Sequence, residues 1–127
     1  MRLLAICALG LLVIPTAAQE MPAAFNKCRA CHEVGEGAPN KAGPKLNGVV
    51  DQPAGGVVDY SYSQALLAAR DGGLVWTREA LTQYLKRPSH MMPGTIMTFA
   101  GMTNRAEIDA IIDYMAIFAS DGTPTTP

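Results

Sequence analysis

The chain has 127 residues, which is enough for one domain with a hydrophobic core but not for two. Its ten basic and eleven acidic residues give a formal net charge of −1, which argues against nucleic acid or an anionic membrane surface as the partner. Composition restricts the function no further.

The first eighteen residues are predicted to be a secretory signal peptide. Arg2 is the charged start, the apolar run 3–14 follows it, and Thr16-Ala17-Ala18 is a small-residue cleavage site. The apolar run is short for a membrane span, although an uncleaved signal could act as a weak anchor. We therefore expect a mature chain that begins near Gln19 and is exported to a bacterial periplasm.

A C-x-x-C-H motif follows, with cysteines at Cys28 and Cys31 and a histidine at His32. The motif is typical of covalent attachment of a c-type haem. Two thiols three positions apart on a helical turn project to one side, where each can add to a porphyrin vinyl group. His32 then points its imidazole at the iron. The segment from Met21 to the motif is short and mixed, with Phe25 available to pack inward.

The two cysteines also allow readings without haem, namely a structural disulfide, a thioredoxin-like redox pair or half of a zinc site. A zinc site needs two more ligands, and the remaining candidates are Cys7, in the predicted signal peptide, and His90. A thioredoxin-like pair should follow a strand and open a long helix, which this neighbourhood does not resemble. A second iron ligand further along the chain would decide in favour of haem.

The next segment, residues 34–56, is predicted to be a loop because it holds six glycines and three prolines without a sustained period. Long ordered loops usually perform a function or enclose something. Beyond it, residues 63–70 can form a short helix that ends at the Asp71-Gly72-Gly73 turn. Thr77 is a candidate N-cap for a further helix, which Pro88 ends and whose apolar residues recur at helical spacing: Leu81, Tyr84 and Leu85.

Residues 89–101 are predicted to be irregular, and the clearest helix of the sequence follows them. Asn104 and Glu107 form a plausible capping pair at its start. Asp109 and Asp113 lie on one face of this helix, and the opposite face is apolar: Ile108, Ile111, Ile112, Met115, Phe118 and Ala119. Residues 120–127 are a Thr/Pro tail that we expect to be disordered.

These elements predict an all-α chain of short helices joined by long loops. Such a chain has too little regular structure for a good core of its own. A haem would supply a large apolar plate over which the loops can close. We therefore expect the haem-free chain to be poorly folded.

Residues 93–101 read Pro-Gly-Thr-Ile-Met-Thr-Phe-Ala-Gly. This segment resembles the P-G-T-x-M-x-F-A-G loop of the class I cytochromes c of the mitochondrial and related bacterial type, and further matches run from Phe25 to Phe118. In that family the methionine of the loop is the distal iron ligand, which the resemblance assigns to Met97. The other methionines nearby do not fit that place and are expected to pack in the interior: Met91, Met92 and Met102.

The resemblance also implies roles for residues around the haem. Gly43-Pro44-Lys45-Leu46 is similar to a G-P-x-L segment in which the carbonyl of the proline, here Pro44, accepts the imidazole N–H of the proximal histidine. Tyr62 and Trp76 match residues that hydrogen-bond a haem propionate. Three more residues match the family on the distal side: Tyr84, whose hydroxyl would lie near the methionine sulfur, Thr95, which would donate in the same loop, and Phe99, which would close the haem cleft. Without the resemblance, the tyrosines and the tryptophan would be ordinary core aromatics.

The chain departs from the family in three respects. Gln52 stands where an arginine usually lies near the propionates, and Leu66 stands where an asparagine is often found near the haem. The segment before the C-x-x-C-H motif is short, so a truncated first helix is expected. The family's ring of lysines is thinned, because other residues hold several of its positions: Ser89, His90, Ile96, Thr103 and Asn104. The basic residues that remain are Lys27, Lys41, Lys86, Arg87 and Arg105.

We therefore expect residues 19–119 to form a monohaem c-type cytochrome with the cytochrome c fold. One haem c would be attached through Cys28 and Cys31 and ligated by His32 and Met97. Filled axial positions leave no open site for a substrate, which argues against an enzyme. The expected function is to carry single electrons in the periplasm, as a monomer without a stable membrane span, between respiratory or photosynthetic partners. Candidate partners are a quinol-oxidising bc complex, a terminal oxidase, a reaction centre or a periplasmic dehydrogenase.

Three other functions stay open at this point. The protein could be a dedicated electron donor or acceptor of one periplasmic dehydrogenase. It could be a haem peroxidase or gas sensor in which Met97 dissociates. It could also be a haem-free redox module that uses Cys28 and Cys31. The sequence does not name the electron donor or the acceptor.

Overall fold

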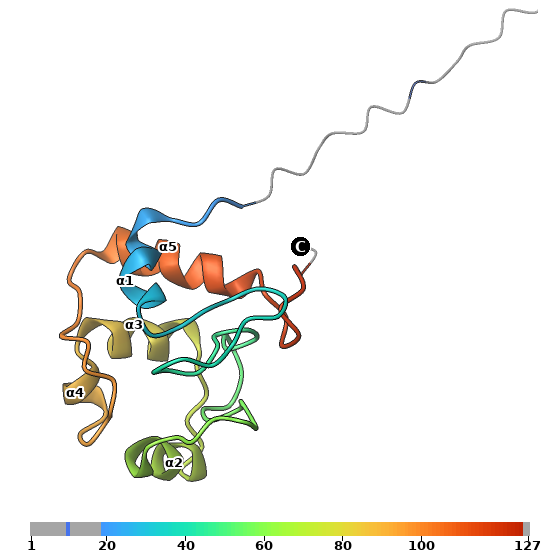
Figure 1. The fold of residues 1–127 in the computed structure, drawn as a ribbon. Helices are drawn as coiled ribbons and strands as arrows, with labels where there is room; N and C mark the ends of the chain where they lie inside the picture. The colour runs from blue at the N-terminus through green and yellow to red at the C-terminus, as the bar shows by residue number, and fades with distance from the viewer. Residues whose placement is uncertain (1–9, 11–18, 126–127) are drawn as a thin grey trace, which may run out of the picture.

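Short helices separated by long loops make up the protein in this computed structural model, which describes Gly10 and residues 19–125 (Figure 1). The helices are η1 (Ala23–Phe25), α1 (Asn26–Arg29), α2 (Gln64–Asp71), α3 (Arg78–Lys86), α4 (Pro88–Met91) and α5 (Arg105–Ala116). Within these residues there is no strand, and pairing is limited to two isolated bridges, Pro53 with Val75 and Phe118 with Pro124. The predicted signal peptide, apart from Gly10, lies outside the described residues.

Three helices begin where the sequence predicts. The side chains of Ser63, Thr77 and Asn104 accept backbone N–H groups at the starts of α2, α3 and α5. Each therefore satisfies a donor that has no partner inside its helix. The capping pair at α5 is only half formed, because the carboxylate of Glu107 pairs with Lys27 at 3.1 Å. That ion pair links the start of α5 to α1.

The helix α4 corrects the expectation that the chain is irregular from Ser89 onward. Pro88 ends α3, but it also begins α4, with a bond of 2.9 Å from the Met92 N–H to its carbonyl. Proline suits the first position of a helix because the missing N–H would have no partner there and its φ is already helical. A proline that stops one helix can therefore open the next.

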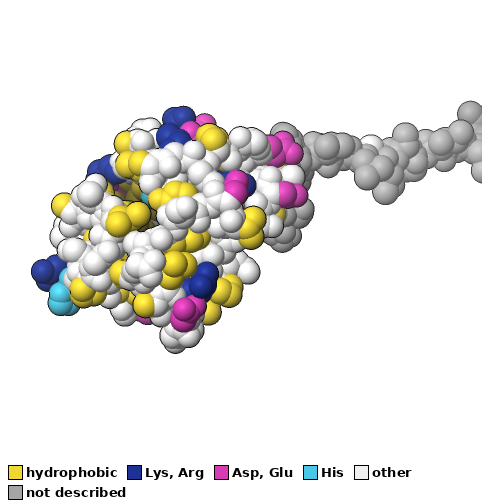
Figure 2. Space-filling model, turned by 60° about the horizontal axis from the view of Figure 1, so that its bottom comes forward, with side chains coloured by type: hydrophobic (Ala, Val, Ile, Leu, Met, Phe, Trp, Pro, Cys, Tyr) yellow, Lys and Arg dark blue, Asp and Glu magenta, His cyan; other side chains and the backbone are white. Residues whose placement is uncertain are grey.

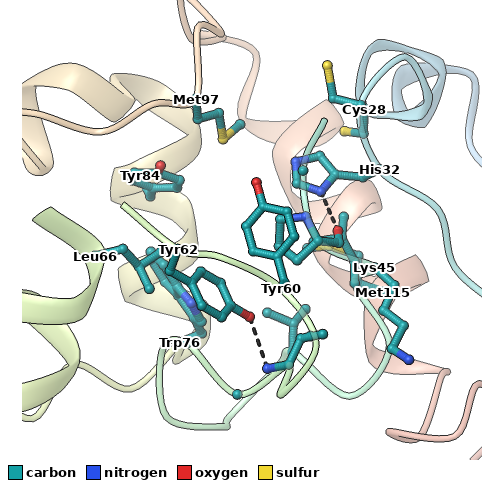
Figure 3. Close-up of a pocket in the computed structure, with 18 of the residues that line it drawn as sticks. Cys28, His32, Lys45, Tyr60, Tyr62, Leu66, Trp76, Tyr84, Met97 and Met115 are labelled. Atoms are coloured by element: carbon teal, nitrogen blue, oxygen red, sulfur yellow. Dashed lines mark hydrogen bonds between the residues drawn. The ribbon is translucent and has the colours of Figure 1, made fainter. Parts of the chain in front are cut away.

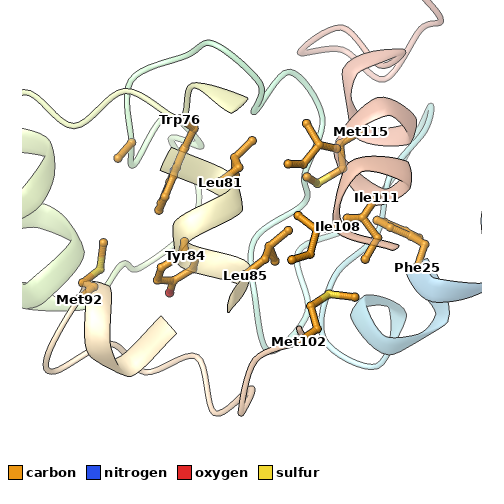
Figure 4. Close-up of a cluster of buried hydrophobic side chains, with 12 residues drawn as sticks. Phe25, Trp76, Leu81, Tyr84, Leu85, Met92, Met102, Ile108, Ile111 and Met115 are labelled. Carbon is orange, nitrogen blue, oxygen red and sulfur yellow. The ribbon is translucent and has the colours of Figure 1, made fainter. Parts of the chain in front are cut away.

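The core forms where α5 packs against η1 and against α3 (Figure 4). Phe25, Ile108 and Ile112 are completely buried, and the ring of Tyr114 meets that of Phe25 edge-on at a centroid distance of 5.0 Å. The apolar face that the sequence predicts for α5 is confirmed for its helical members: Ile108, Ile111, Ile112 and Met115. This packing fixes the segment that carries the C-x-x-C-H motif, because η1 runs directly into α1, which contains Cys28.

Residues 34–56 contain no helix, as predicted, and run beside the motif before α2 (Figure 1). Asn47 is buried in this loop and holds Gly35 by two bonds. Its amide oxygen accepts the N–H of Gly35 at 2.8 Å, and its amide nitrogen donates to the Gly35 carbonyl at 2.9 Å. The loop is therefore ordered by its own side chains rather than by regular structure.

The described part of the C-terminal segment differs from the disorder expected from Ser120 onward. Residues 118–125 turn back on themselves, with bonds from the Ala119 N–H to the Thr123 carbonyl and from the Thr125 N–H to the Ile117 carbonyl. Gly122 is buried at φ +85°, and a Cβ there would lie 2.1 Å from the Gly35 carbonyl oxygen. A glycine is needed for both the positive φ and this close approach, and the turn that it permits packs against the 34–56 loop.

Candidate functional site

A cavity of about 640 Å³ lies between the C-x-x-C-H segment, the long loop, α3, α5 and the loop after α4. It opens to the surface as a hollow (Figure 2). Its lining is mostly apolar and includes every residue that the sequence analysis proposed for the site: Cys28, Cys31, His32, Pro44, Tyr62, Trp76, Tyr84, Thr95, Met97 and Phe99. Residues that are far apart in the sequence therefore meet at one place.

His32 follows directly after the helical turn that carries the two cysteines, since its N–H donates to the Cys28 carbonyl at 2.9 Å. The Nδ1 of its ring lies 2.6 Å from the carbonyl oxygen of Pro44. A carbonyl can only accept, so Nδ1 carries the proton, and Nε2 is left with a lone pair. Burial lowers the pKa of His32, the bond to Pro44 opposes this, and the charge of Lys41 adds to the lowering. The ring is therefore a neutral imidazole.

Gly43 makes room for this ring. A Cβ at Gly43 would lie 2.2 Å from Cε1 of His32, well inside contact distance. The N–H of Gly43 also donates to the Cys31 carbonyl at 2.8 Å. Gly43 thus holds the histidine by a close backbone contact, and Pro44 holds it by a hydrogen bond. The family resemblance predicted the hydrogen bond but not the close contact.

Cys28 and Cys31 are free thiols at the edge of the cavity, and Cys28 lies beside His32 (Figure 3). Cys28 is half-buried, and burial raises the pKa of its thiol to about 11 against the opposing charge of Lys27. Within the described part of the chain no three His, Cys, Asp or Glu side chains gather as a metal site, and His90 lies on α4. The zinc reading, which needed Cys7 and His90, finds no support among these residues.

Met97 faces His32 from the opposite side of the cavity (Figure 3). Its N–H donates to Thr95 Oγ1 at 3.2 Å, and the hydroxyl groups of Thr95 and Tyr84 lie 2.7 Å apart. The loop that presents the methionine is therefore tied to α3. The other methionines pack in the interior, as the sequence analysis expects: Met92 and Met102 in the core and Met91 against it.

Tyr62 and Trp76 lie on the side of the cavity away from the cysteines (Figure 3). The hydroxyl of Tyr62 accepts the Val57 N–H at 2.9 Å, so its own proton is free for another acceptor. Burial raises the pKa of Tyr62 and also that of Tyr84, so both phenols are protonated at neutral pH. Trp76 is 6% exposed and packs on Tyr84 with a centroid distance of 5.0 Å.

The sequence analysis missed Tyr60, which also lines the cavity (Figure 3). Its hydroxyl donates to the Ala42 carbonyl at 2.7 Å, and its ring meets that of Tyr62 edge-on at 5.0 Å. The Tyr-Ser-Tyr spacing could have indicated it, because alternate residues of an extended segment lie on one face. Gln52 and Leu66, which differ from the residues usual in the family, line the cavity as well.

This set of side chains fits a haem. An imidazole nitrogen with a free lone pair and a thioether sulfur face one another across a cavity with apolar walls, and two thiols stand at its edge beside the imidazole. Imidazole and thioether are the axial donors of Met/His cytochromes, and paired thiols are what covalent attachment needs.

Known proteins are similar to this chain over most of its length. The chain is 46% identical over 102 residues to cytochrome c2 of Agrobacterium tumefaciens (strain II Chrys), covering 80% of this chain and 91% of that protein. It is 44% identical over 100 residues to cytochrome c2 of Afifella marina, covering 79% and 81%. The chain belongs to the class I cytochromes c.

The fold of this cytochrome also matches solved structures. It aligns with cytochrome c2 from Rhodospirillum centenum at a TM-score of 0.72 and 33% identity, covering 76% of this chain and 93% of that one. No family model matches the chain. The all-α cytochrome c fold that the sequence predicts is confirmed. The cytochrome carries one covalent haem c and transports electrons, and it is not an enzyme.

Proposed function

We propose that His32 and Met97 are the two axial ligands of the haem iron and that Cys28 and Cys31 form its two thioether links. In this role the cytochrome carries one electron at a time in the periplasm, between respiratory or photosynthetic redox proteins. The facing of His32 and Met97 across the apolar cavity is the observation that carries the proposal.

When bound, the haem supplies a one-electron couple between ferric and ferrous iron. The protein's part is to keep both axial donors in place during transfer, so that little rearrangement accompanies the change of charge. Pro44 holds His32 in the tautomer that leaves Nε2 free, and Gly43 packs against the ring. Thr95 and Tyr84 hold the loop of Met97 from α3. Two independent sets of bonds thus fix the two donors.

The walls of the cavity set its polarity. Trp76, Leu81 and Leu85 are at most 6% exposed and exclude water from one side. A low-polarity site disfavours the extra charge of ferric iron, and a thioether favours ferrous iron, so the midpoint potential should be positive. Gln52, which is neutral, provides no charge to raise it further.

Export and choice of partner belong to the same proposal. Residues 1–18 have the pattern of a secretory signal, and covalent haem attachment is completed outside the cytoplasm. Across the described residues, no helix is both long and apolar enough to cross a membrane. The candidate partners remain those that the family resemblance implies: a bc complex, a terminal oxidase, a reaction centre or a periplasmic dehydrogenase.

A difference spectrum of the exported protein tests the haem assignment. The reduced-minus-oxidised spectrum should show sharp c-type bands, and denaturation should not release the haem. Cys28→Ala and Cys31→Ala should each leave one thioether link, which shifts the pyridine-haemochrome band, and the double variant should lose its haem on denaturation. A haem that stays attached to the denatured double variant would contradict the assignment of these cysteines.

A further inference from the structure

We propose that Arg70 of α2 is the cation that offsets the carboxylates of the haem in this cytochrome, a charge that Gln52 does not supply. The inference rests on the proposed function, because it assumes that the haem is attached through Cys28 and Cys31. It gives a part in setting the midpoint potential to a residue for which the sequence analysis proposed no role.

The two cysteines decide which wall of the cavity faces the haem carboxylates. A haem carries its two vinyl groups on one edge and its two propionate groups on the opposite edge. When Cys28 and Cys31 hold the vinyl edge, the propionates face the wall away from the cysteines, where Tyr62 and Trp76 lie (Figure 3). The hydroxyl of Tyr62 accepts the Val57 N–H and keeps its own proton for a carboxylate.

The lining of that wall contains no cation of its own. Among the described residues that line the cavity, those with a full charge are Lys27, Lys45 and Asp59. Lys27 directly precedes Cys28. Lys45 directly follows Pro44, which binds the histidine of the motif, so both lysines belong to the C-x-x-C-H side. Asp59 lies nearer to the opposite wall, since its negative charge adds to burial, the largest cause, in raising the pKa of Tyr62.

Arg70 packs on this wall from outside, against Gly55. Gly55 lines the cavity at φ +73°, and a Cβ there would lie 3.2 Å from Cδ of Arg70 and 3.8 Å from its Nη1. The same Cβ would lie 3.3 Å from Leu66, which is one turn earlier on α2 and lines the cavity itself. A glycine is needed for the positive φ and for this close approach. The guanidinium therefore lies directly behind the loop whose Val57 N–H binds Tyr62.

Asp71 orients the guanidinium. Its Oδ1 accepts hydrogen bonds from both Nε and Nη2 of Arg70, each at 3.1 Å, which leaves Nη1 on the side of Gly55. The side chain of Asp71 is 70% exposed and that of Arg70 is 43% exposed. The negative end of the pair thus points to solvent and the positive end to the cavity wall. An exposed pair adds little stability, so the direction of its charges is its main consequence.

A cation at this wall acts on the redox couple. Ferric haem carries one positive charge more than ferrous haem, and the carboxylates of the propionates favour the ferric form. A guanidinium that offsets these carboxylates favours the ferrous form and so raises the midpoint potential. Gln52 lines the cavity without a charge, which leaves this effect to Arg70.

Opposite substitutions in the ion pair test this inference by redox titration of the intact holoprotein. Arg70→Gln should lower the midpoint potential, and Asp71→Asn, which removes the counter-charge of the guanidinium, should raise it. Arg70→Lys keeps the charge and should keep most of the potential. Gln52→Arg, added to Arg70→Gln, should restore part of the lost potential. Both shifts should shrink at high salt, because the pair is partly exposed.

Arg105→Gln and Asp113→Asn are the matched controls. They make the same changes of charge in exposed ion pairs on α5, outside the cavity lining, and should shift the potential less. Shifts of the same sign from Arg70→Gln and Asp71→Asn, no shift from either, or equal shifts from the controls would overturn the inference. Failure of the proposed function would instead remove the covalent haem or its reversible one-electron couple from the parent protein itself.

Discussion

The hydroxyl groups of Tyr84 and Thr95 lie 2.7 Å apart and tie α3 to the loop that presents Met97. Thr95 Oγ1 also accepts the N–H of Met97. The backbone that leads to Met97 is therefore held by one short network, which reaches from α3 into an otherwise irregular loop.

Tyr84→Phe should loosen that loop. We expect the free energy of unfolding to fall by about 1 kcal/mol, the usual contribution of one hydrogen bond. The weak long-wavelength band of the Met–iron bond should disappear at a lower denaturant concentration than in the parent protein. Tyr60→Phe is the control, because it removes a bond of equal length to Ala42, away from the Met97 loop. Equal effects of both variants on the band would contradict a specific role for Tyr84.

Gly43→Ala should displace His32. The new Cβ would lie 2.2 Å from the imidazole ring, so the ring or the backbone must move. We expect a loss of about 1–3 kcal/mol in the free energy of unfolding, as for other overpacked sites, together with an altered ferric spectrum. Gly56→Ala, whose nearest atom is the Pro53 oxygen at 3.6 Å, should leave both unchanged. An unaltered Gly43→Ala protein would show that the ring is not confined there.

Gln52→Arg should raise the midpoint potential. Gln52 lines the cavity, and a positive charge there disfavours ferric haem. By the same reasoning, the unaltered protein should have a lower potential than close relatives that keep the arginine. Redox titration measures the shift, and Gln83→Arg, which lines a separate hollow at α3 and α4, should change the potential less. No change or a fall in Gln52→Arg would count against this account.

Removal of residues 120–127 should destabilise the protein, because the turn after Phe118 packs on Gly35. We expect a loss of about 1–2 kcal/mol in chemical denaturation at neutral pH, as is common for the loss of a few hydrogen bonds. If the segment were a disordered tail, its removal would change nothing.

The stability that the C-terminal turn contributes should depend on pH through Asp121. Hydrogen bonds from the hydroxyl and the N–H of Thr123 lower the pKa of Asp121. A lowered pKa contributes stability above the ordinary pKa of an aspartate, and this contribution is lost as pH falls through the folded value. Asp121→Asn should therefore be less stable than the parent at neutral pH and equal to it in strong acid. A deficit that persists in strong acid would assign the loss to packing instead.

Most of the helices could be predicted from short patterns in the sequence. Ser63, Thr77 and Asn104 each cap a helix that their sequence neighbourhood predicts, since a cap bonds within three residues of itself. The C-x-x-C-H and P-G-T-x-M segments also located the candidate site, because each holds its chemistry in a short stretch. Their resemblance to a family then placed the two segments on opposite sides of one cavity.

Contacts between residues that are far apart in the sequence could not be predicted, because no local pattern indicates them. The contact of Tyr60 with Ala42 spans 18 residues, and the ion pair of Lys27 with Glu107 spans 80.

Helix α4 was missed for a different reason. Pro88 was read only as the end of α3, although a proline also suits the first position of a helix. The C-terminal turn depends on a close approach of Gly122 to Gly35, which no local pattern reports.

Ligation of the iron by His32 and Met97 is the central claim, and Met97→Ala tests it most directly. The ferric absorption spectrum and the midpoint potential of this variant should be compared with those of the parent and of Met91→Ala. We predict that Met97→Ala keeps its covalent haem, loses the Met–iron band and has a lower potential, whereas Met91→Ala matches the parent. Retention of the band in Met97→Ala, or its loss in Met91→Ala, would contradict the account.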